Sequence, residues 1–292
     1  MKSIAKLAFG PSGSKAGRST WVRLTLTYLF CVIGSIFMLL PLLWLVRSSV
    51  MTLDQIFRFP PEWVPAPFAW WNYPDALTTV PFLLYFKNTV FILVPTVIGT
   101  VITATLAAYG FSRLRWRARD LIFNLLLTTL MLPYAITLIP TFLLWAHLGL
   151  VNTTWPLVLP RWCGGGIFYI FLLRQFFRTI PRELDEAAIL DGANPIQVLW
   201  HVIVPLSRPA LITVAIFSAL GAWNDFLGPL MYLNDSNKYT LALGLAEFTG
   251  LYSSQWHLLM AASTVVIMPV VVLFFFAQRH FIEGIAITGT KG

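Results

Sequence analysis

Six long apolar runs dominate the hydropathy pattern of this chain, and short polar segments separate them. They cover residues 24–46, 88–112, 121–145, 155–177, 209–233 and 256–278. A helix that spans a bilayer needs about 20 mostly apolar residues, and it satisfies every backbone polar group within one segment. The alternation of outward and inward residues that marks a membrane β-barrel is absent. The pattern therefore predicts an all-α, polytopic membrane protein with six transmembrane helices.

Composition strengthens this prediction. Of the 292 residues, 58% are hydrophobic and 11% are charged, whereas soluble domains carry about 25% charged residues. The fourth run is the weakest because it contains Arg161, Arg174 and three glycines at 164–166. These glycines either allow close helix packing, which we favour, or unwind the helix beside a cavity. Cys31, Cys163 and four scattered histidines show no metal-ligand spacing, so we expect no metal site.

The distribution of basic residues predicts the orientation. With the N-terminus in the cytoplasm, fifteen of the 20 Lys and Arg residues face the cytoplasm, four face outward, and Arg161 is not assigned. Cytoplasmic loops carry such an excess, so we expect both termini inside. This asymmetry accounts for the net charge of +8 without any nucleic acid. The run at 24–46 is longer than the 7–15-residue core of a signal peptide, so we expect a retained helix.

The predicted organisation follows from these boundaries. A basic cytoplasmic tail (1–23) precedes the first transmembrane helix (24–46), and an external segment follows (47–87). Residues 88–278 form a five-helix core that includes a cytoplasmic loop at 178–208, and a cytoplasmic tail covers 279–292. Seven aromatic residues between Phe57 and Tyr73 of the external segment are typical of a belt at the membrane surface, although sugar stacking is the alternative.

The stretch "RELDEAAILDGANP" at 182–195 holds four of the 12 acidic residues. Carboxylates favour the first turn of a helix, and Pro181 precedes that turn. Gly192 permits a bend, and Asn194 can cap a second short helix that runs to about Val202. Pro205 is expected to end that helix. The alternative, an ordinary interfacial amphipathic helix, would more readily be basic, because the inner leaflet is anionic.

The same stretch carries a spaced motif. Glu186-Ala187-Ala188 is followed after three residues by Gly192, and after nine more by the segment 202–205, which ends in Pro205. The motif resembles the EAA loop of ABC importer permeases, with Val202 in place of Ile and Val204 in place of Leu. Phrases between Phe86 and Gly292, such as "PLSRPALITVAIFSALGAWNDFLGPL", are similar to the carbohydrate-uptake, maltose-type branch.

This resemblance implies a type I ABC importer permease fold in the cell membrane of a prokaryote. The expected solute is a di- or oligosaccharide, and a polyol or a glycerol phosphate is the alternative. It implies four kinds of partner: a homologous second permease subunit, two cytoplasmic ATPase subunits that bind ATP and Mg, an extracytoplasmic solute-binding protein, and membrane lipid. Residues implied to couple this chain to the ATPase are Glu186, Ala187, Ala188, Asp191, Gly192 and Pro205. The resemblance also places the tail at 284–292 against the ATPase pair, the alternative being a frayed terminus.

Asp225 is the one acidic residue within the six runs, and an ionisable group at such depth is a functional candidate. Together with Trp223 and Asn224 it offers an aromatic face and hydrogen-bonding groups for a sugar. Helix packing is the alternative for all three.

Other classes of function fit less well. The stretch "GPSGSKAGRST" lacks the Lys-Ser/Thr pair that a phosphate-binding loop requires, so we expect no cofactor on this chain and no ATP hydrolysis by it. An ion-coupled secondary transporter is the alternative function. It would show internal repeats and more buried ionisable groups. A membrane enzyme would need a cluster of catalytic side chains, and the sequence shows none.

Overall fold

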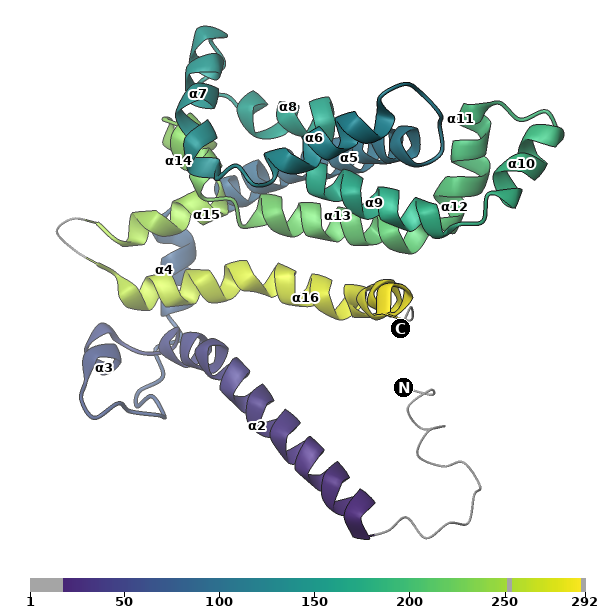
Figure 1. The fold of residues 1–292 in the computed structure, drawn as a ribbon. Helices are drawn as coiled ribbons and strands as arrows, with labels where there is room; N and C mark the ends of the chain where they lie inside the picture. Colours follow the sequence, from purple (N-terminus) through teal and green to yellow (C-terminus); the bar gives the residue numbers. More distant parts are fainter. Residues whose placement is uncertain (1–17, 251–253, 290–292) are drawn as a thin grey trace.

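The computed structural model describes residues 18–250 and 254–289 and is built from helices (Figure 1). Within these residues, extended pairing is confined to an isolated bridge between Thr249 and Ser254. Four helical segments are long and apolar enough to cross a membrane: Trp21–Ser48, Phe82–Ser112, Trp155–Thr179 and Trp256–Gln278. Two bent helix pairs raise the number to six if each pair is one span. Residues 1–17 of the predicted tail at 1–23, and residues 290–292 of the predicted tail at 279–292, lie outside the described residues.

The helices follow one another with short connections. In chain order they are α2 (Arg18–Ser48), α3 (Leu53–Phe57), α4 (Asn72–Thr79), α5 (Phe82–Ser112), α6 (Arg119–Thr129), α7 (Tyr134–His147), α8 (Trp155–Gly164), α9 (Ile167–Thr179), α10 (Glu183–Leu190), α11 (Pro195–Val198), a π-helical turn (Leu199–Ile203), α12 (Val204–Leu206), α13 (Arg208–Trp223), α14 (Leu227–Tyr232), α15 (Leu241–Gly244) and α16 (Trp256–Gly289), with 3₁₀ turns at Ser236–Lys238 and Leu245–Phe248.

Helix α5 is the centre of the bundle. It is apolar on all sides and packs against α8, α9 and α13, while α16 packs against α13, α4 and α2. Buried apolar side chains form two separate clusters along this bundle. One lies where the end of α5 meets α9, α11 and α13, and includes Leu173, Phe177 and Ile203. The other lies where the start of α5 meets α4 and α16, and includes Tyr85 and Ala261.

The third predicted span is two helices rather than one. Helices α6 and α7 meet at an angle of 99° across a break of a few residues. Pro133 occupies the N-cap of α7, and a residue before proline is driven away from helical backbone angles, so Leu132 cannot continue α6 smoothly. The apolar run continues through the break, so hydropathy predicted one span, in which Pro133 implied only a kink.

The fifth predicted span also differs from its expected form. Helix α13 ends at Trp223, and a separate short helix, α14, begins at Leu227. Between them, Asp225 turns its carboxylate to accept a hydrogen bond from the Gly228 N–H at 3.0 Å. This side chain satisfies a donor at the start of α14, so the one acidic residue of the apolar run lies at the break between the two helices.

The external segment predicted at 47–87 folds back on the end of α2. The Asn72 amide is buried and donates to the carbonyls of Ser49 and Met51 at 3.0 and 2.7 Å. Helix α5 begins at Phe82, so it takes in the last residues of this segment. Six of the seven aromatic side chains remain exposed, namely Phe57, Phe59, Trp63, Phe68, Trp70 and Trp71.

Candidate functional site

The segment between α9 and α13 forms a compact loop at one end of the bundle, opposite the end that carries α3 and α15 (Figure 1). Its first helix, α10, ends in a Schellman motif. The Ala193 N–H donates to the Ala188 carbonyl at 2.9 Å, and the Gly192 N–H donates to the Ile189 carbonyl at 3.0 Å. Gly192 has a φ of +88°, which favours glycine at this position. A Cβ there would meet open space, so the backbone angle, and not close packing, requires the glycine.

The second half of the loop begins at a capping box. The Asn194 side chain accepts from the Gln197 N–H at 2.9 Å, and the Gln197 side chain accepts from the Asn194 N–H at 2.8 Å. The predicted end of this helix near Val202 is wrong, because the helical path continues through Pro205 to Leu206. In the π-helical turn the Val204 N–H reaches back to the Leu199 carbonyl, five residues earlier. This wider turn accommodates Pro205, and the 81° bend follows between α12 and α13.

A buried ion pair fixes the loop to the bundle. Arg113 follows the last residue of α5, and its guanidinium lies 3.0 Å from the Asp185 carboxylate of α10. The same guanidinium donates to the carbonyls of Phe177 and Ile180 at the end of α9, at 2.5 and 2.8 Å. Burial raises the pKa of the Asp185 carboxyl above its usual range, and the positive charge of Arg113 opposes that shift.

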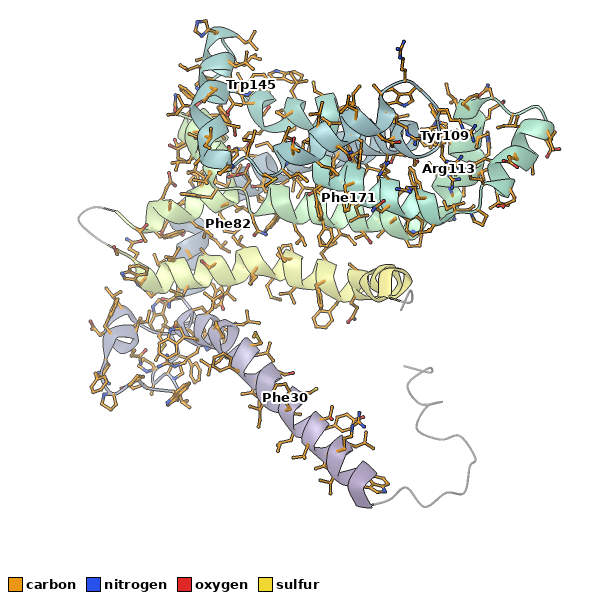
Figure 2. The ribbon with its side chains drawn as sticks, in the orientation of Figure 1. Phe30, Phe82, Tyr109, Arg113, Trp145 and Phe171 are labelled. Carbon is orange, nitrogen blue, oxygen red and sulfur yellow. The ribbon has the colours of Figure 1, made fainter. Side chains whose placement is uncertain are left out.

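The second contact point lies four residues earlier on α5. The Tyr109 hydroxyl donates to the Pro195 carbonyl at 2.9 Å, and Figure 2 shows Tyr109 and Arg113 together where α5 approaches α11. One face of α5 therefore holds both halves of the loop, and Arg113 also holds α9. A displacement of the loop would be transmitted to two long helices through polar contacts, because these contacts have a fixed geometry.

The outer face of the loop is free in this chain. Glu186 and Ala187 are exposed, whereas Ala188 is half-buried and packs on the first apolar cluster. Asp191 is exposed beside the turn. Several large apolar side chains are also exposed here, with Leu190 at 88% and Ile196 at 68%; the others are Leu184, Ile189 and Trp200. Large exposed apolar side chains grouped with an acidic residue are typical of a protein-binding surface.

The structure adds a second candidate region, a cavity of about 530 Å³ in the bundle that is lined by both apolar and polar side chains. Helices α5, α7, α8, α13 and α14 all contribute to its walls. The cavity lies between the two apolar clusters along α5. Its polar and aromatic lining consists of Thr96, Tyr134, Thr141, Trp145, Arg161, Ser218, Asp225, Tyr232 and Thr240. Such a mixture of hydroxyl, aromatic and charged groups can bind a hydroxylated solute.

The three residues predicted for a solute path do not lie together. Asp225 lines the cavity, but Trp223 is buried in the second apolar cluster, where its indole N–H donates to the Val266 carbonyl at 3.2 Å. The Asn224 side chain donates to the Leu220 carbonyl at 3.0 Å. Neither Trp223 nor Asn224 is part of the cavity lining. Sequence reasoning missed Tyr134, Trp145 and Tyr232, which resemble ordinary belt aromatics in an apolar run.

The glycines of the fourth run serve both of the roles that the sequence left open. Gly165 has a φ of +60°, and a Cβ on it would lie 2.6 Å from the Ala104 backbone nitrogen, so the helix breaks and α5 approaches closely. Gly166 has a φ of +91° and lines the cavity. Helices α8 and α9 therefore meet at a break that faces the cavity, and this break gives the cavity part of its wall.

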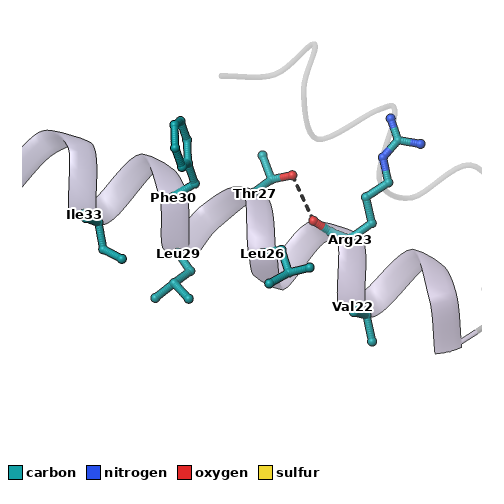
Figure 3. A pocket seen from close by; sticks show the side chains of 7 residues that line it. All are labelled: Val22, Arg23, Leu26, Thr27, Leu29, Phe30 and Ile33. Carbon is teal, nitrogen blue, oxygen red and sulfur yellow. Dashed lines mark hydrogen bonds between the residues drawn. The ribbon is translucent and has the colours of Figure 1, made fainter.

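A larger hollow runs along α2, but it is not a solute site. Its seven lining residues, among them Val22, Leu26 and Phe30, all come from one helix, α2 (Figure 3). Helix α2 leaves the bundle, and none of its most apolar window is buried within this chain (Figure 1). The hollow therefore belongs to an apolar helix surface that faces away from this chain's core.

Comparison with known proteins identifies the class to which this bundle and loop belong. Residues 99–287 match the family described as "Binding-protein-dependent transport system inner membrane component". The chain is 33% identical over 283 residues to a probable ABC transporter permease protein, YurM, of Bacillus subtilis, covering 95% of this chain and 92% of the relative. It is 31% identical to the diacetylchitobiose uptake system permease protein NgcG of Streptomyces coelicolor, covering 81% and 79% of the two chains.

The fold agrees with a solved structure. A bacterial ABC transporter involved in the import of the acidic polysaccharide alginate contains a chain that superposes with a TM-score of 0.79 at 24% identity, covering 92% of this chain and 99% of that one. The protein is a multi-pass membrane permease with the type I ABC importer fold. It belongs to the family of binding-protein-dependent transport system inner membrane components, and its role is that of a transport subunit.

Proposed function

We propose that this chain is one of two permease subunits through which a bacterial importer moves a di- or oligosaccharide across the cytoplasmic membrane. The loop at 178–208 carries this proposal, because it combines a spaced motif, an outward-facing Glu186 and a rigid attachment to α5 and α9. A carbohydrate as solute is supported by the printed function of the NgcG relative and by the hydroxyl and aromatic lining of the cavity.

In this proposal the loop converts motion of an ATPase into motion of the bundle. Two cytoplasmic ATPase subunits bind ATP and Mg, and one of them receives α10 through Glu186, Ala187 and the exposed apolar side chains. Ala187 has no side chain beyond Cβ, so a partner surface can approach the α10 backbone. Arg113 and Tyr109 then transmit the displacement to α5, which walls the cavity, and Arg113 transmits it also to α9, which begins directly after the cavity-lining Gly166. Alternating access follows from a change in the tilt of these helices.

Other partners complete the path. A homologous second permease would close the open side of the cavity, and an extracytoplasmic binding protein would deliver the solute. The apolar surface of α2, where no residue of the most apolar window is buried in this chain, supports contact with lipid or with that second subunit. Both termini lie in the cytoplasm in this arrangement, because Arg113, Arg178 and Arg182 then lie on the positive side with the loop.

The first test measures the sidedness of the loop. A variant without Cys31 and Cys163 receives one new cysteine, either at Glu186 or at Asp54 of the external segment, and intact cells are treated with an impermeant thiol reagent. We expect labelling at position 54 in intact cells and at position 186 only after lysis. Labelling at position 186 in intact cells would place the loop outside and contradict the proposal.

The second test measures coupling. The assembled transporter is purified in detergent, and we expect Glu186→Lys to lose its ATPase subunits at least tenfold, whereas Asp54→Lys keeps them. Each variant reverses an exposed negative charge in the first turn of a helix, α10 for Glu186 and α3 for Asp54. A loss of ATPase subunits in the Glu186 variant alone would therefore result from the position of the charge on the loop, and not from charge reversal in general. Uptake driven by a proton or sodium gradient in liposomes that contain only this chain would instead support an ion-coupled secondary transporter.

A further inference from the structure

The cavity contains a cation that the fold does not neutralise. Arg161 belongs to the helical segment Trp155–Thr179, which is long and apolar enough to span a membrane, and it lines the cavity. Among the residues that the structure describes, no carboxylate lies within 4.0 Å of its guanidinium, although four other Arg–carboxylate pairs are formed. Arg161 is exposed within this chain, so water at the open side of the cavity can compensate its charge until an acidic group binds there.

The fold directs this guanidinium toward the break between α8 and α9. A Cβ on Gly166 would lie 2.9 Å from the Arg161 Nη1, so the guanidinium rests against the backbone of the break. Gly166 lies five residues beyond Arg161 and has a φ of +91°, a conformation that favours glycine. The backbone of α8 is also fixed, because the Thr103 hydroxyl of α5 donates to the Arg161 carbonyl at 2.9 Å. The position of the charge is therefore built into the helix break.

The single carboxylate on the cavity wall is engaged elsewhere. Asp225 accepts from the Gly228 N–H, and a Cβ on Gly228 would lie 2.5 Å from its other carboxylate oxygen, so the group is held against the start of α14. The cavity thus presents a donor-only cation at the α8–α9 break and an acceptor-only anion at α14. A solute with an acidic group and hydroxyl groups would satisfy both, with the acidic group at Arg161 and the hydroxyls at Asp225.

We propose that Arg161 is a specificity-determining residue that selects saccharides that carry a carboxylate or phosphate group. This inference rests on the proposed function, because it takes the cavity as part of the solute path. An arginine suits this role since its planar guanidinium binds carboxylate and phosphate through two parallel hydrogen bonds.

Charge-selective thiol labelling tests the inference in the assembled transporter, in membranes. The full-length chain carries Cys31→Ser, Cys163→Ser and Ala222→Cys, because Ala222 lines the cavity and differs little from cysteine in size. The rates of labelling by an anionic and a cationic methanethiosulfonate reagent are compared on this chain. We expect Arg161→Gln to lower the anionic-to-cationic rate ratio at least about fivefold, since one unit of charge is removed near the thiol. Arg161→Lys keeps the ratio, and so does Arg117→Gln, which removes an exposed charge outside the cavity.

Protection of the same cysteine identifies the ligand chemistry. D-glucuronate is compared with D-glucose, and sn-glycerol 3-phosphate with glycerol, at equal concentrations. We expect an acidic probe to slow labelling more than tenfold relative to its neutral counterpart, and Arg161→Gln to abolish the difference. The member of the acidic pair that protects better distinguishes a carboxylate from a phosphate.

The possible negative results separate the two proposals. Equal protection by acidic and neutral probes, or a rate ratio unchanged by Arg161→Gln, overturns the selectivity proposal and leaves the permease function intact. An unchanged ratio would also be the result if a carboxylate of the second permease neutralised Arg161. A cysteine at position 222 that neither reagent reaches, in a transporter that still binds its ATPase, would remove the cavity as a path and the selectivity proposal with it.

Discussion

The loop at 178–208 and the cavity differ in how their residues are distributed along the chain. Every element of the loop lies within about 30 consecutive residues, apart from its anchors Tyr109 and Arg113 on α5. The cavity takes its walls from five helices that are spread over more than 140 residues. Caps and turns are local, so a short sequence specifies them, whereas a cavity depends on how distant helices pack. The variants below test this contrast, from the largest expected effect to the smallest.

The cavity wall should be most sensitive at Gly165. Gly165→Ala combines a φ of +60° with a Cβ only 2.6 Å from the Ala104 backbone nitrogen, which cannot move aside as a side chain could. We expect a loss of about 2–5 kcal/mol of stability, from backbone strain and overpacking together, and a low yield of folded protein in detergent. Gly164→Ala is the control, because a Cβ there meets open space. Equal melting temperatures for the two variants would contradict the close approach of α5.

The anchor of the loop should come next. Arg113→Met leaves the Asp185 carboxylate with a buried, unpaired charge, and removing one partner of a buried pair costs about 3–5 kcal/mol. Asp185 is partly exposed, at 15%, so we expect the lower end of that range, measured by thermal unfolding in detergent.

The double variant Arg113→Met/Asp185→Leu separates burial of a charge from transmission of motion. It should recover stability, because no unpaired charge remains, while ATP hydrolysis stays uncoupled from uptake in proteoliposomes. Restored coupling in the double variant would show that the ion pair has no part in transmission.

The turn of the loop should show a smaller and purely local effect. Gly192→Ala forces a φ of +88° on a residue with a Cβ and should cost about 1 kcal/mol. Gly192→Asn should cost less, because asparagine is accepted at this position of a Schellman motif. The measured quantities are the melting temperature and the fraction of ATPase subunits retained during purification. Equal losses for Ala and Asn would indicate a steric role for Gly192, which its open surroundings argue against.

The smallest effect is expected where a local hydrogen bond lies on the cavity wall. Asp225→Asn keeps an oxygen that accepts from the Gly228 N–H, so stability should change by less than about 0.5 kcal/mol. Asp225→Ala removes that acceptor and should cost about 1 kcal/mol. If both variants unfold at the same temperature as the parent protein, the Asp225 side chain is not needed to start α14. The role of Asp225 would then lie in the cavity wall.

The sequence by itself determined the elements that depend on local chemistry. Apolar length located the first and last spans, 24–46 and 256–278, within α2 and α16. The acidic first turn of α10, the bend at Gly192 and the Asn194 cap were all predicted, because each depends on residues within five positions of one another. The motif that begins at Glu186 identified the family from the same short stretch.

Tertiary structure decided the rest. The break between α6 and α7 occurs inside a continuous apolar run. Hydropathy shows how long such a run is, but it does not show that the helix axis turns by 99° within it. The helix continues through Pro205 because a π-helical turn precedes it. The helix propensities of the residues do not predict such a turn. The sequence showed that Arg113 is one of the basic residues that indicate the orientation. It could not show that Arg113 pairs with Asp185, because the two residues lie 72 positions apart. Arg161 and Asp225 face one cavity, and Trp223 lies outside it, because helix packing fixes which side of each helix is buried.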